Sequence, residues 1–270
     1  MATRIAFIGG GNMASAIIGG LLRQGFGVAD ILVVEPYEPT RAKLLQDFGL
    51  QALPECGPTL QGAGMVVWAV KPQTFKDAAA AAAPYTAAAL HLSVAAGIPS
   101  SSIARWVGTE RVVRTMPNTP ALIGKGITGV YARPAVTEAD RTLAEQVVRT
   151  TGDCVWLDNE GQLDTVTALS GSGPAYFFYF MEAMTQAGTE LGLSAEQAYR
   201  LAVATCVGAG ELAKASPEPA SVLRERVTSK GGTTYAALTS MQTSGVADSF
   251  VRAMHAAHQR AGELGREFGV

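Results

Sequence analysis

The sequence predicts an α/β protein in two parts: a parallel sheet with flanking helices, then a part made only of helices. Short apolar runs alternate with stretches of helical spacing through the first half of the chain. Glycines follow the first apolar run, at the point where the first helix is expected to begin. Strand signals stop after Asp158-Asn159-Glu160-Gly161. Alternation of this kind produces right-handed βαβ units and therefore parallel strands.

The elements of the first half follow from the spacing of apolar residues and from turn residues. Short continuous apolar runs predict strands that are buried on both faces. Helical spacing separates these runs, and Gly49 marks the end of one helix. The predicted strands are 3–8, 31–35, 65–70, 91–94 and 111–115, and the predicted helices are 12–24, 40–48 and 78–83.

The second half is predicted to be helical. Ser194, with Gln197 three residues later, has the pattern of a capping box at a helix start. The helix that follows is expected to extend to about Ala215, where prolines end it. Its segment 201–210 is small and apolar almost all round, so we expect it to be buried on most sides. Further helices are predicted over 175–191, 233–243 and 246–268, and the domains are predicted to be 1–160 and 161–270.

One predicted helix of the second half carries a broad apolar stripe. A domain built from few helices has limited means of covering such a stripe by itself. Two interpretations remain open: the stripe packs within one chain, or two chains share one helical core. We prefer the second. The stripe consists of Phe177, Phe180, Met181, Met184 and Leu191.

Composition and charge exclude several classes of function. A formal net charge of −2 provides no basic stripe for nucleic acid or an anionic membrane. The longest apolar stretch, 78–98, is interrupted by Pro84 and by polar residues, so it does not predict a membrane span. The histidines lack metal-ligand spacing, and the cysteines are expected to be unpaired in a reducing compartment. We therefore expect a soluble cytoplasmic protein without a metal site. The cysteines are Cys56, Cys154 and Cys206.

The first motif, Gly9-Gly10-Gly11-Asn12-Met13-Ala14, lies between the first predicted strand and the first predicted helix. It satisfies the GxGxxA pattern of a Rossmann-type dinucleotide-binding turn. Gly9 permits the sharp turn, Gly11 lets the backbone approach a pyrophosphate, and Ala14 keeps the helix close to the strand. The helix N-terminus offers free N–H groups and the positive end of its dipole to the anion. The motif therefore predicts a dinucleotide cofactor.

Glu35 and Arg41 bear on the choice of cofactor. An acidic residue at the end of the second strand accepts hydrogen bonds from the adenosine ribose and disfavours a 2′-phosphate. Glu35 alone therefore points to NAD(H). Arg41, in the first turn of the next helix, is close enough in sequence to reach a 2′-phosphate. Both residues are also compatible with ordinary surface charges, and the choice between NAD(H) and NADP(H) stays open.

Two further loops follow predicted strands, at the edge of a parallel sheet where ligands bind in such folds. The first is Ala69-Val70-Lys71-Pro72-Gln73, in which Pro72 restricts Lys71 to an extended conformation. The second is Met116-Pro117-Asn118-Thr119-Pro120, in which two prolines stiffen a loop that carries the Asn118 amide. Each loop suits the surroundings of a nicotinamide, and each is equally compatible with a turn that has no ligand.

The helical half carries two motifs at helix starts. Ser170-Gly171-Ser172-Gly173-Pro174 precedes a helix and places a proline in its first turn. The segment 227–234 places two glycines and several hydroxyls at another helix N-terminus. Backbone N–H groups and the Thr234 hydroxyl there suit a carboxylate. A simple N-cap by Thr233 would account for the same segment without a ligand.

These motifs, in this order, resemble those of the pyrroline-5-carboxylate reductase family, and the resemblance covers nearly the entire chain. It implies NAD(P)H-dependent reduction of 1-pyrroline-5-carboxylate to L-proline, the last step of proline biosynthesis, with NADP(H) the common cofactor. It also implies a C-terminal helical domain that forms a homodimer, often within a larger ring. The motifs are GGGNMA, AVKPQ, SVAAG (93–97), MPNTP, LSGSGPAY (169–176) and VTSKGGTTYAAL (227–238), the last being the most specific to the family.

The resemblance also implies roles for individual residues. The Thr234 hydroxyl would lie near the imine nitrogen and is the candidate catalytic group. The chain departs from the family at Lys230, where proline is usual. It also departs at Cys56, near the position at which family members carry an asparagine that touches the adenosine ribose. The candidate substrate-binding residues are Ser229, Gly231, Gly232, Thr233 and Thr234. The candidate cofactor-binding residues are Gly9, Gly11, Asn12, Met13, Ala14, Glu35, Ala69, Val70, Lys71, Pro72 and Asn118.

Two alternative functions remain. A β-hydroxyacid dehydrogenase-like reductase needs a lysine that projects from a helix, and the helical half offers only Lys214 and Lys230 outside any obvious catalytic motif. A non-catalytic dinucleotide-binding protein would not need the polar segment 229–234. A protonated cyclic imine is already a good hydride acceptor, so an imine reductase mainly has to place its substrate and exclude water.

Overall fold

The structure is a computed structural model that describes residues 3–269. These residues form two compact units. The sheet unit contains residues 3–172 and 257–269, and the helical unit contains Gly173–Ala256. The last helix, α11 (Val246–Phe268), therefore begins in the helical unit and ends in the sheet unit.

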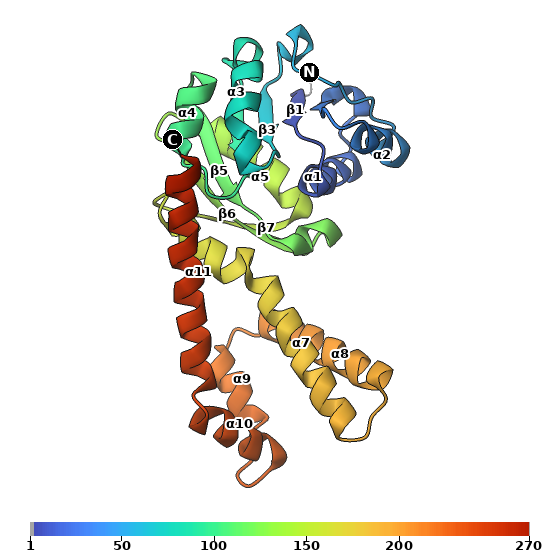
Figure 1. The fold of residues 1–270 in the computed structure, drawn as a ribbon, viewed down its shortest axis with the longest axis vertical. Helices are drawn as coiled ribbons and strands as arrows, with labels where there is room; N and C mark the ends of the chain where they lie inside the picture. The colour runs from blue at the N-terminus through green and yellow to red at the C-terminus, as the bar shows by residue number, and fades with distance from the viewer. Residues whose placement is uncertain (1–2, 270) are drawn as a thin grey trace. The chain divides into compact units, whose positions relative to one another are not determined.

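The sheet unit is built on a seven-stranded sheet with the order β2-β1-β3-β4-β5-β6-β7 (Figure 1). Strands β5 and β6 are antiparallel, and the other adjoining pairs of described strands are parallel. The predicted α/β class is confirmed, and β6 and β7 are additions that we did not predict. The strands are β1 (Ile5–Ile8), β2 (Ile31–Val34), β3 (Met65–Trp68), β4 (Leu90–Ser93), β5 (Val112–Met116), β6 (Gly126–Ala132) and β7 (Gly152–Trp156).

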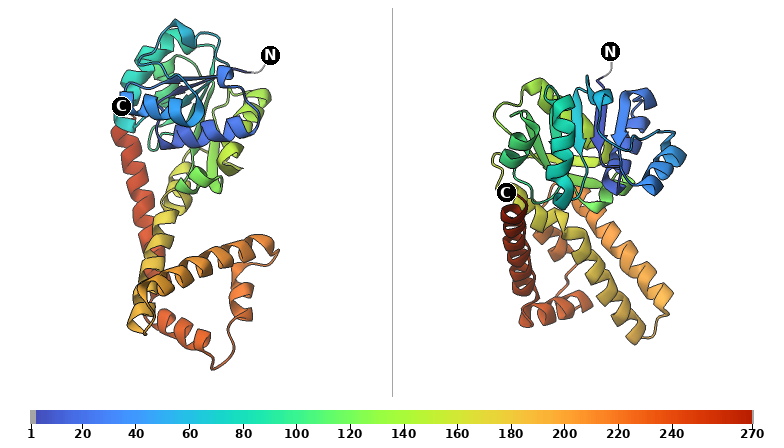
Figure 2. Two further views of the ribbon diagram at one scale, coloured as in Figure 1. Left: turned by 90° about the vertical axis from the view of Figure 1, so that its right-hand side faces the viewer. Right: turned by 45° about the horizontal axis from the view of Figure 1, so that its top comes forward.

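Helices cover both faces of this sheet (Figure 2). Successive strand residues point to opposite faces, so β1 places Phe7 in one core and Ile8 in the other. The Phe7 core contains residues of α1, α2 and α5, and the Ile8 core contains residues of α3 and α4. The helices are α1 (Asn12–Arg23), α2 (Glu38–Phe48), α3 (Pro72–Thr86), α4 (Ser100–Val107), α5 (Glu138–Val148) and α6 (Gln162–Val166).

The helical unit contains α7 (Gly173–Glu190), α8 (Ala195–Ala215), α9 (Ala220–Arg226), α10 (Thr233–Thr243) and the first part of α11. The predicted capping box is confirmed: Gln197 N donates to Ser194 Oγ at 3.2 Å, and Ser194 N donates to Gln197 Oε1 at 3.0 Å. Helices α10 and α11 have the predicted bounds.

The prediction that segment 201–210 is buried is wrong for a single chain. Leu201 is 58% exposed and Val207 is 54% exposed. Helix α8 buries Ala198 and Ala202, and within this unit it packs mainly against α7. Of residues 173–256, all of which the structure describes, those buried are Gly173, Ala198 and Ala202.

His91, on β4, is fully buried, and both nitrogens of its ring have a hydrogen-bond partner. Trp68 Nε1 donates to His91 Nδ1 at 3.0 Å, and His91 Nε2 lies 3.1 Å from the carbonyl oxygen of Thr86. A neutral ring protonated at Nε2 satisfies both contacts. Burial lowers the pKa of His91 to about 4, because the charged form would lose its hydration.

We expect this histidine to make folding stability dependent on pH. In the unfolded chain a histidine titrates near 6.5, so the unfolded state takes up a proton that the folded state excludes. Stability should be complete above about pH 6.5 and fall by about 3 kcal/mol as the pH drops toward 4. Urea unfolding of wild-type protein and His91→Gln across this window tests the expectation.

The variant should be less stable at pH 7 and show a flatter pH dependence than the wild type. His258→Gln, at an exposed position, is the matched control and should retain the wild-type slope. Equal slopes for His91→Gln and the wild type would contradict the expectation.

Candidate cofactor and substrate sites

The expected cofactor residues meet where the strand order of the sheet reverses. Strand β1 lies between β2 and β3, so the connections after β1 lead to opposite sides of the sheet. The carboxyl ends of parallel strands at such a point form the usual crevice for a ligand in α/β proteins. Gly9 follows β1, Glu35 follows β2 and Ala69 follows β3, which places all three at this edge.

Gly9 is held in a conformation that suits glycine. Its φ is +95°, and its N–H donates to the carbonyl oxygen of Val34 at 2.8 Å. A Cβ atom at this position would lie 2.6 Å from the backbone oxygen of Ala69. The loops after β1 and β3 therefore pack directly against each other at Gly9, and a side chain would force them apart.

The start of α1 is suited to an anion. Gly11 is the N-cap, and no side chain of the described residues caps this helix. No described atom lies within 4 Å of the position that a Cβ of Gly11 would take, so the space above the turn is open. Ala14 is fully buried against the sheet, Met13 is partly buried and Asn12 is exposed. This geometry fits a pyrophosphate on the free N–H groups of the first turn.

The Glu35 carboxylate is hydrogen-bonded to the backbone of the glycine turn. Its Oε2 accepts from Gly10 N at 2.8 Å, and its Oε1 accepts from Tyr37 N at 2.9 Å. Arg41 donates from Nη1 to the carbonyl oxygens of Glu35 at 3.0 Å and Pro36 at 2.6 Å. A carboxylate and a guanidinium are thus both fixed at the end of β2, where the adenosine ribose is expected.

The loop after β3 has the predicted form. Lys71 is extended, with φ −66° and ψ 146°, and α3 begins at Pro72. Ala69 N donates to the carbonyl oxygen of Ile8 at 2.8 Å, which binds this loop to β1. The side chain of Lys71 is exposed, and its carbonyl oxygen accepts from Thr74 N at 3.0 Å.

Within the sheet unit, the Met116 loop lies against Gly171 of the Leu169–Tyr176 motif. Gly171 ends a π-helical segment, Thr167–Gly171, that we did not predict. A Cβ on Gly171 would lie 2.5 Å from Met116 Cε, so a side chain there would displace the end of the flexible Met116 side chain. Asn118 is buried, and its Oδ1 accepts from Ile127 N at 3.0 Å, which fixes the Met116 loop on β6. Single-turn π-helices occur frequently at functional sites.

The candidate substrate segment lies in the helical unit, at the start of α10. The N-cap is Gly232, so the alternative of an N-cap by Thr233 is wrong. Gly232 N donates to the carbonyl oxygen of Ser229 at 3.0 Å, which closes the turn. No side chain within residues 3–269 caps α10, and the Thr234 hydroxyl has no hydrogen-bond partner there. The turn therefore offers backbone N–H groups and a free hydroxyl, as a carboxylate site requires.

The thiols, the possible metal ligands and the longer helices complete the description of residues 3–269. The three cysteines are free thiols. Between residues 3 and 269, no group of histidine, cysteine, aspartate and glutamate side chains is arranged to hold a metal ion. None of the helices in that range has the length and apolar content needed to cross a membrane.

Comparison with known proteins places the chain in a family. The family model for pyrroline-5-carboxylate reductase dimerisation matches residues 160–264, and that for NADP oxidoreductase, coenzyme F420-dependent, matches residues 4–97. A pyrroline-5-carboxylate reductase of Pseudomonas aeruginosa is 46% identical over 268 residues, covering 98% of each chain, and one of Vibrio alginolyticus is 39% identical over 269 residues with the same coverage.

Solved structures agree with these matches. The structure of a pyrroline-5-carboxylate reductase from Coxiella burnetii has a TM-score of 0.91 at 35% identity and covers 98% of this chain and 99% of its own. The Plasmodium falciparum enzyme, solved with NADP bound, has a TM-score of 0.86 at 26% identity and covers 97% of this chain and 98% of its own. This chain belongs to the pyrroline-5-carboxylate reductase family of NAD(P)-dependent oxidoreductases.

Proposed function

We propose that this chain reduces 1-pyrroline-5-carboxylate to L-proline with NAD(P)H. One observation carries the proposal: the chain is 46% identical, over 98% of its length, to a pyrroline-5-carboxylate reductase. The glycine turn after β1 and the uncapped turn before α10 support the two halves of this chemistry, because one suits a pyrophosphate and the other a carboxylate.

We assign cofactor binding to domain 1–160 and substrate binding to domain 161–270. Bound NAD(P)H supplies the hydride. The residues of this chain hold the two molecules, with the N–H groups at the start of α1 on the pyrophosphate and those at the start of α10 on the substrate carboxylate. Asn118 and the backbone of 69–72 are assigned to the nicotinamide end. The Thr234 hydroxyl is assigned to the imine nitrogen, where a proton must be held.

The decisive assay follows NADPH and NADH oxidation with 1-pyrroline-5-carboxylate and then with ketoacids. We expect turnover of the cyclic imine and none of the ketoacids. Absence of imine turnover with either cofactor would reject the proposal. Turnover of a ketoacid alone would favour the β-hydroxyacid dehydrogenase-like alternative, and tight cofactor binding without any turnover would favour the non-catalytic one.

Thr234→Ala should lower kcat/KM for the imine by roughly 10- to 100-fold, because it removes a hydroxyl placed at the reacting nitrogen. Steady-state kinetics with saturating cofactor measures the loss. Thr239→Ala is the matched control on α10, because the Thr239 hydroxyl already donates to the Tyr235 carbonyl oxygen at 2.8 Å. Thr234→Ser should retain most of the activity. Unchanged turnover and affinity in Thr234→Ala would remove Thr234 from the site.

We propose NADP(H) as the preferred cofactor, with NAD(H) also accepted. Both carboxylate oxygens of Glu35 already accept backbone N–H groups, while Arg41 is fixed at the end of β2 with further N–H groups to donate. A positive charge held there favours a 2′-phosphate, and the NADP-bound Plasmodium falciparum relative supports the preference.

Arg41→Ala should raise the KM for NADPH about tenfold and change the KM for NADH less than about twofold, since only NADPH carries the 2′-phosphate. Lys43→Ala is the control on the same helix, where Lys43 pairs with Asp47. Equal effects of Arg41→Ala on both cofactors would show that Arg41 acts on the fold of the turn rather than on the phosphate.

We further propose that the chain is a cytoplasmic homodimer formed through its helical unit and able to assemble into a larger ring. The match to a dimerisation family model over residues 160–264 supports the dimer, and so do the exposed apolar side chains of α7 and α8. Free thiols suit the reducing cytoplasm.

A further inference from the structure

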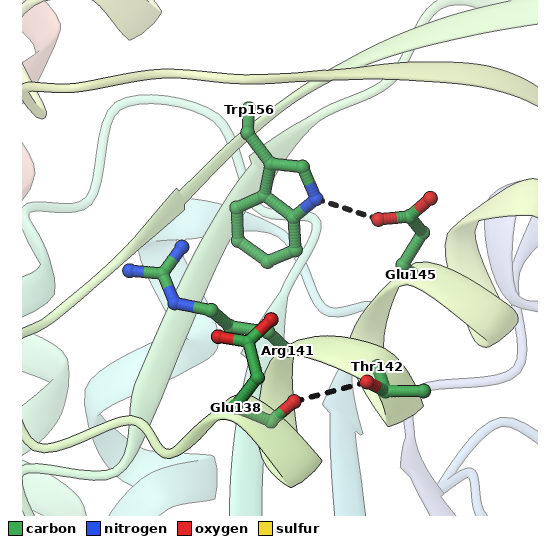
Figure 3. A pocket seen from close by; sticks show the side chains of 5 residues that line it. All are labelled: Glu138, Arg141, Thr142, Glu145 and Trp156. Carbon is green, nitrogen blue, oxygen red and sulfur yellow. Dashed lines mark hydrogen bonds between the residues drawn. The ribbon is translucent and has the colours of Figure 1, made fainter.

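A pocket of about 310 Å³ opens on the sheet unit between α5 and β7 (Figure 3). It contains none of the residues assigned above to cofactor or substrate. Its volume is at the lower end of the range for small-molecule sites and too small for a dinucleotide. The pocket is lined by Glu138, Arg141, Thr142, Glu145 and Trp156.

One wall of the pocket is a fixed indole ring. Trp156, the last residue of β7, donates from Nε1 to Glu145 Oε2 at 2.7 Å. The other oxygen of Glu145 accepts from Arg149 Nε at 2.7 Å. The hydrogen bonds from Trp156 and from Arg149 lower the pKa of Glu145, so this carboxylate stays ionised and keeps the indole in place.

Helix α5 contributes to the pocket two opposite charges that do not pair with each other. Glu138 and Arg141 are three residues apart on α5, a spacing at which such side chains normally interact. Instead, the Arg141 guanidinium lies over the Trp156 ring, with Cζ 4.9 Å from the ring centroid. Within residues 3–269, neither charged side chain has an ion-pair or hydrogen-bond partner. Arg149, the residue that follows α5, pairs with Glu145 and Asp153, so other arginines of this region do form ion pairs.

We propose that this pocket binds an α-amino acid zwitterion, and specifically L-proline, the product of the proposed function. The Arg141 guanidinium takes the carboxylate through two parallel N–H donors. The Glu138 carboxylate takes the ring ammonium group, and the apolar ring lies beside the Arg141 guanidinium, against the methyl group of Thr142. The identity of the ligand rests on the proposed reaction, whereas the zwitterion chemistry rests on the pocket alone.

The presence of both a carboxylate and a guanidinium in the pocket favours a zwitterionic ligand over a ligand with a single charge. A carboxylate without an amine would leave Glu138 beside it as a repelling charge, and an amine without a carboxylate would meet the Arg141 guanidinium. A ligand that carries both charges on one carbon satisfies both side chains across a short distance.

Tryptophan fluorescence of the full-length protein tests the proposal. The chain has three tryptophans. Trp68 stacks on Phe75 in the core and the partly buried Trp106 lies tilted against the same ring, so the response to ligand is expected from Trp156. L-proline should give a saturable change that is lost in Trp156→Phe. Arg141→Gln and Glu138→Gln should each weaken the apparent affinity at least tenfold, and Lys43→Gln should leave it unchanged. Pyrrolidine and propionate should each require at least tenfold higher concentrations than L-proline.

Several outcomes would overturn the proposal. An Arg141→Gln variant that responds like the wild type would do so, as would a response that survives in Trp156→Phe or disappears in Thr234→Ala. Turnover of 1-pyrroline-5-carboxylate, measured separately, should stay within twofold of wild type in Arg141→Gln. If the wild type does not reduce the imine but the Trp156 response persists, the proposed function fails and the pocket stands.

Discussion

Gly9→Ala should weaken NAD(P)H binding by at least about 100-fold. An alanine at φ +95° costs about 1–2 kcal/mol in backbone strain. Its Cβ would also lie 2.6 Å from the backbone oxygen of Ala69, and a backbone atom cannot swing aside. The two loops must then separate at the point where the pyrophosphate is expected. A loss of roughly 3 kcal/mol corresponds to about a 100-fold change in affinity.

A matched control separates strain from the contact with Ala69. Gly108, at the end of α4, also has a positive φ, +76°, but no described atom lies within 4 Å of its Cβ position. Gly108→Ala should therefore cost about 1 kcal/mol of stability and leave cofactor affinity unchanged. Calorimetric titration with NADPH measures both variants. Wild-type affinity in Gly9→Ala would show that the turn after β1 does not hold the cofactor.

The sheet up to β5 could be predicted because its strands are buried on both faces. Strand β3, Met65–Trp68, is wholly buried, and this leaves a continuous apolar run in the sequence. The glycine turn was also predictable, because the positive φ of Gly9 is required by the local turn between a strand and a helix. Local sequence signals of this kind can be interpreted without knowledge of the rest of the fold.

The elements that we did not predict depend on partners that lie far away in the sequence. Strand β7 is at the edge of the sheet and exposes Asp153 and Val155, so it lacks an apolar run. Helix α4 begins at Ser100, whose N–H and hydroxyl both donate to the Glu160 carboxylate, at 2.6 and 2.5 Å. A cap supplied by a residue sixty positions away leaves no local signature. The same is true of the pocket, because Arg141 meets Trp156 only once α5 packs against β7.

The composition of segment 201–210 predicts burial, but most of the segment is exposed in a single chain. Its small apolar residues indicate burial, yet the chain itself supplies too little to cover them. Among residues 173–256, the only buried residues are small ones. Phe177 is 62% exposed and Leu191 is 87% exposed. Apolar area of this extent is costly in water, at roughly 25 cal/mol per Å². The composition is explained if a second chain provides the covering surface.

Val207→Asp should therefore convert the proposed dimer into a monomer. Val207 lies on α8 and is 54% exposed in the single chain. A carboxylate placed in an apolar interface loses its hydration without gaining a partner, which costs several kcal/mol at each of two symmetric positions. Leu45→Asp is the control, because Leu45 is a similarly exposed apolar residue on α2 of the sheet unit, 55% exposed.

Sedimentation velocity at micromolar concentration distinguishes the outcomes. We expect a dimer or a multiple of it for the wild type and for Leu45→Asp, and a lower mass with a lower melting temperature for Val207→Asp. A wild-type monomer would contradict the proposed dimer. An unchanged mass for Val207→Asp would instead place the interface on another face of the helical unit. The exposure of α8 makes the first result the expected one, because a helix that buries only Ala198 and Ala202 has its larger apolar residues left for a partner.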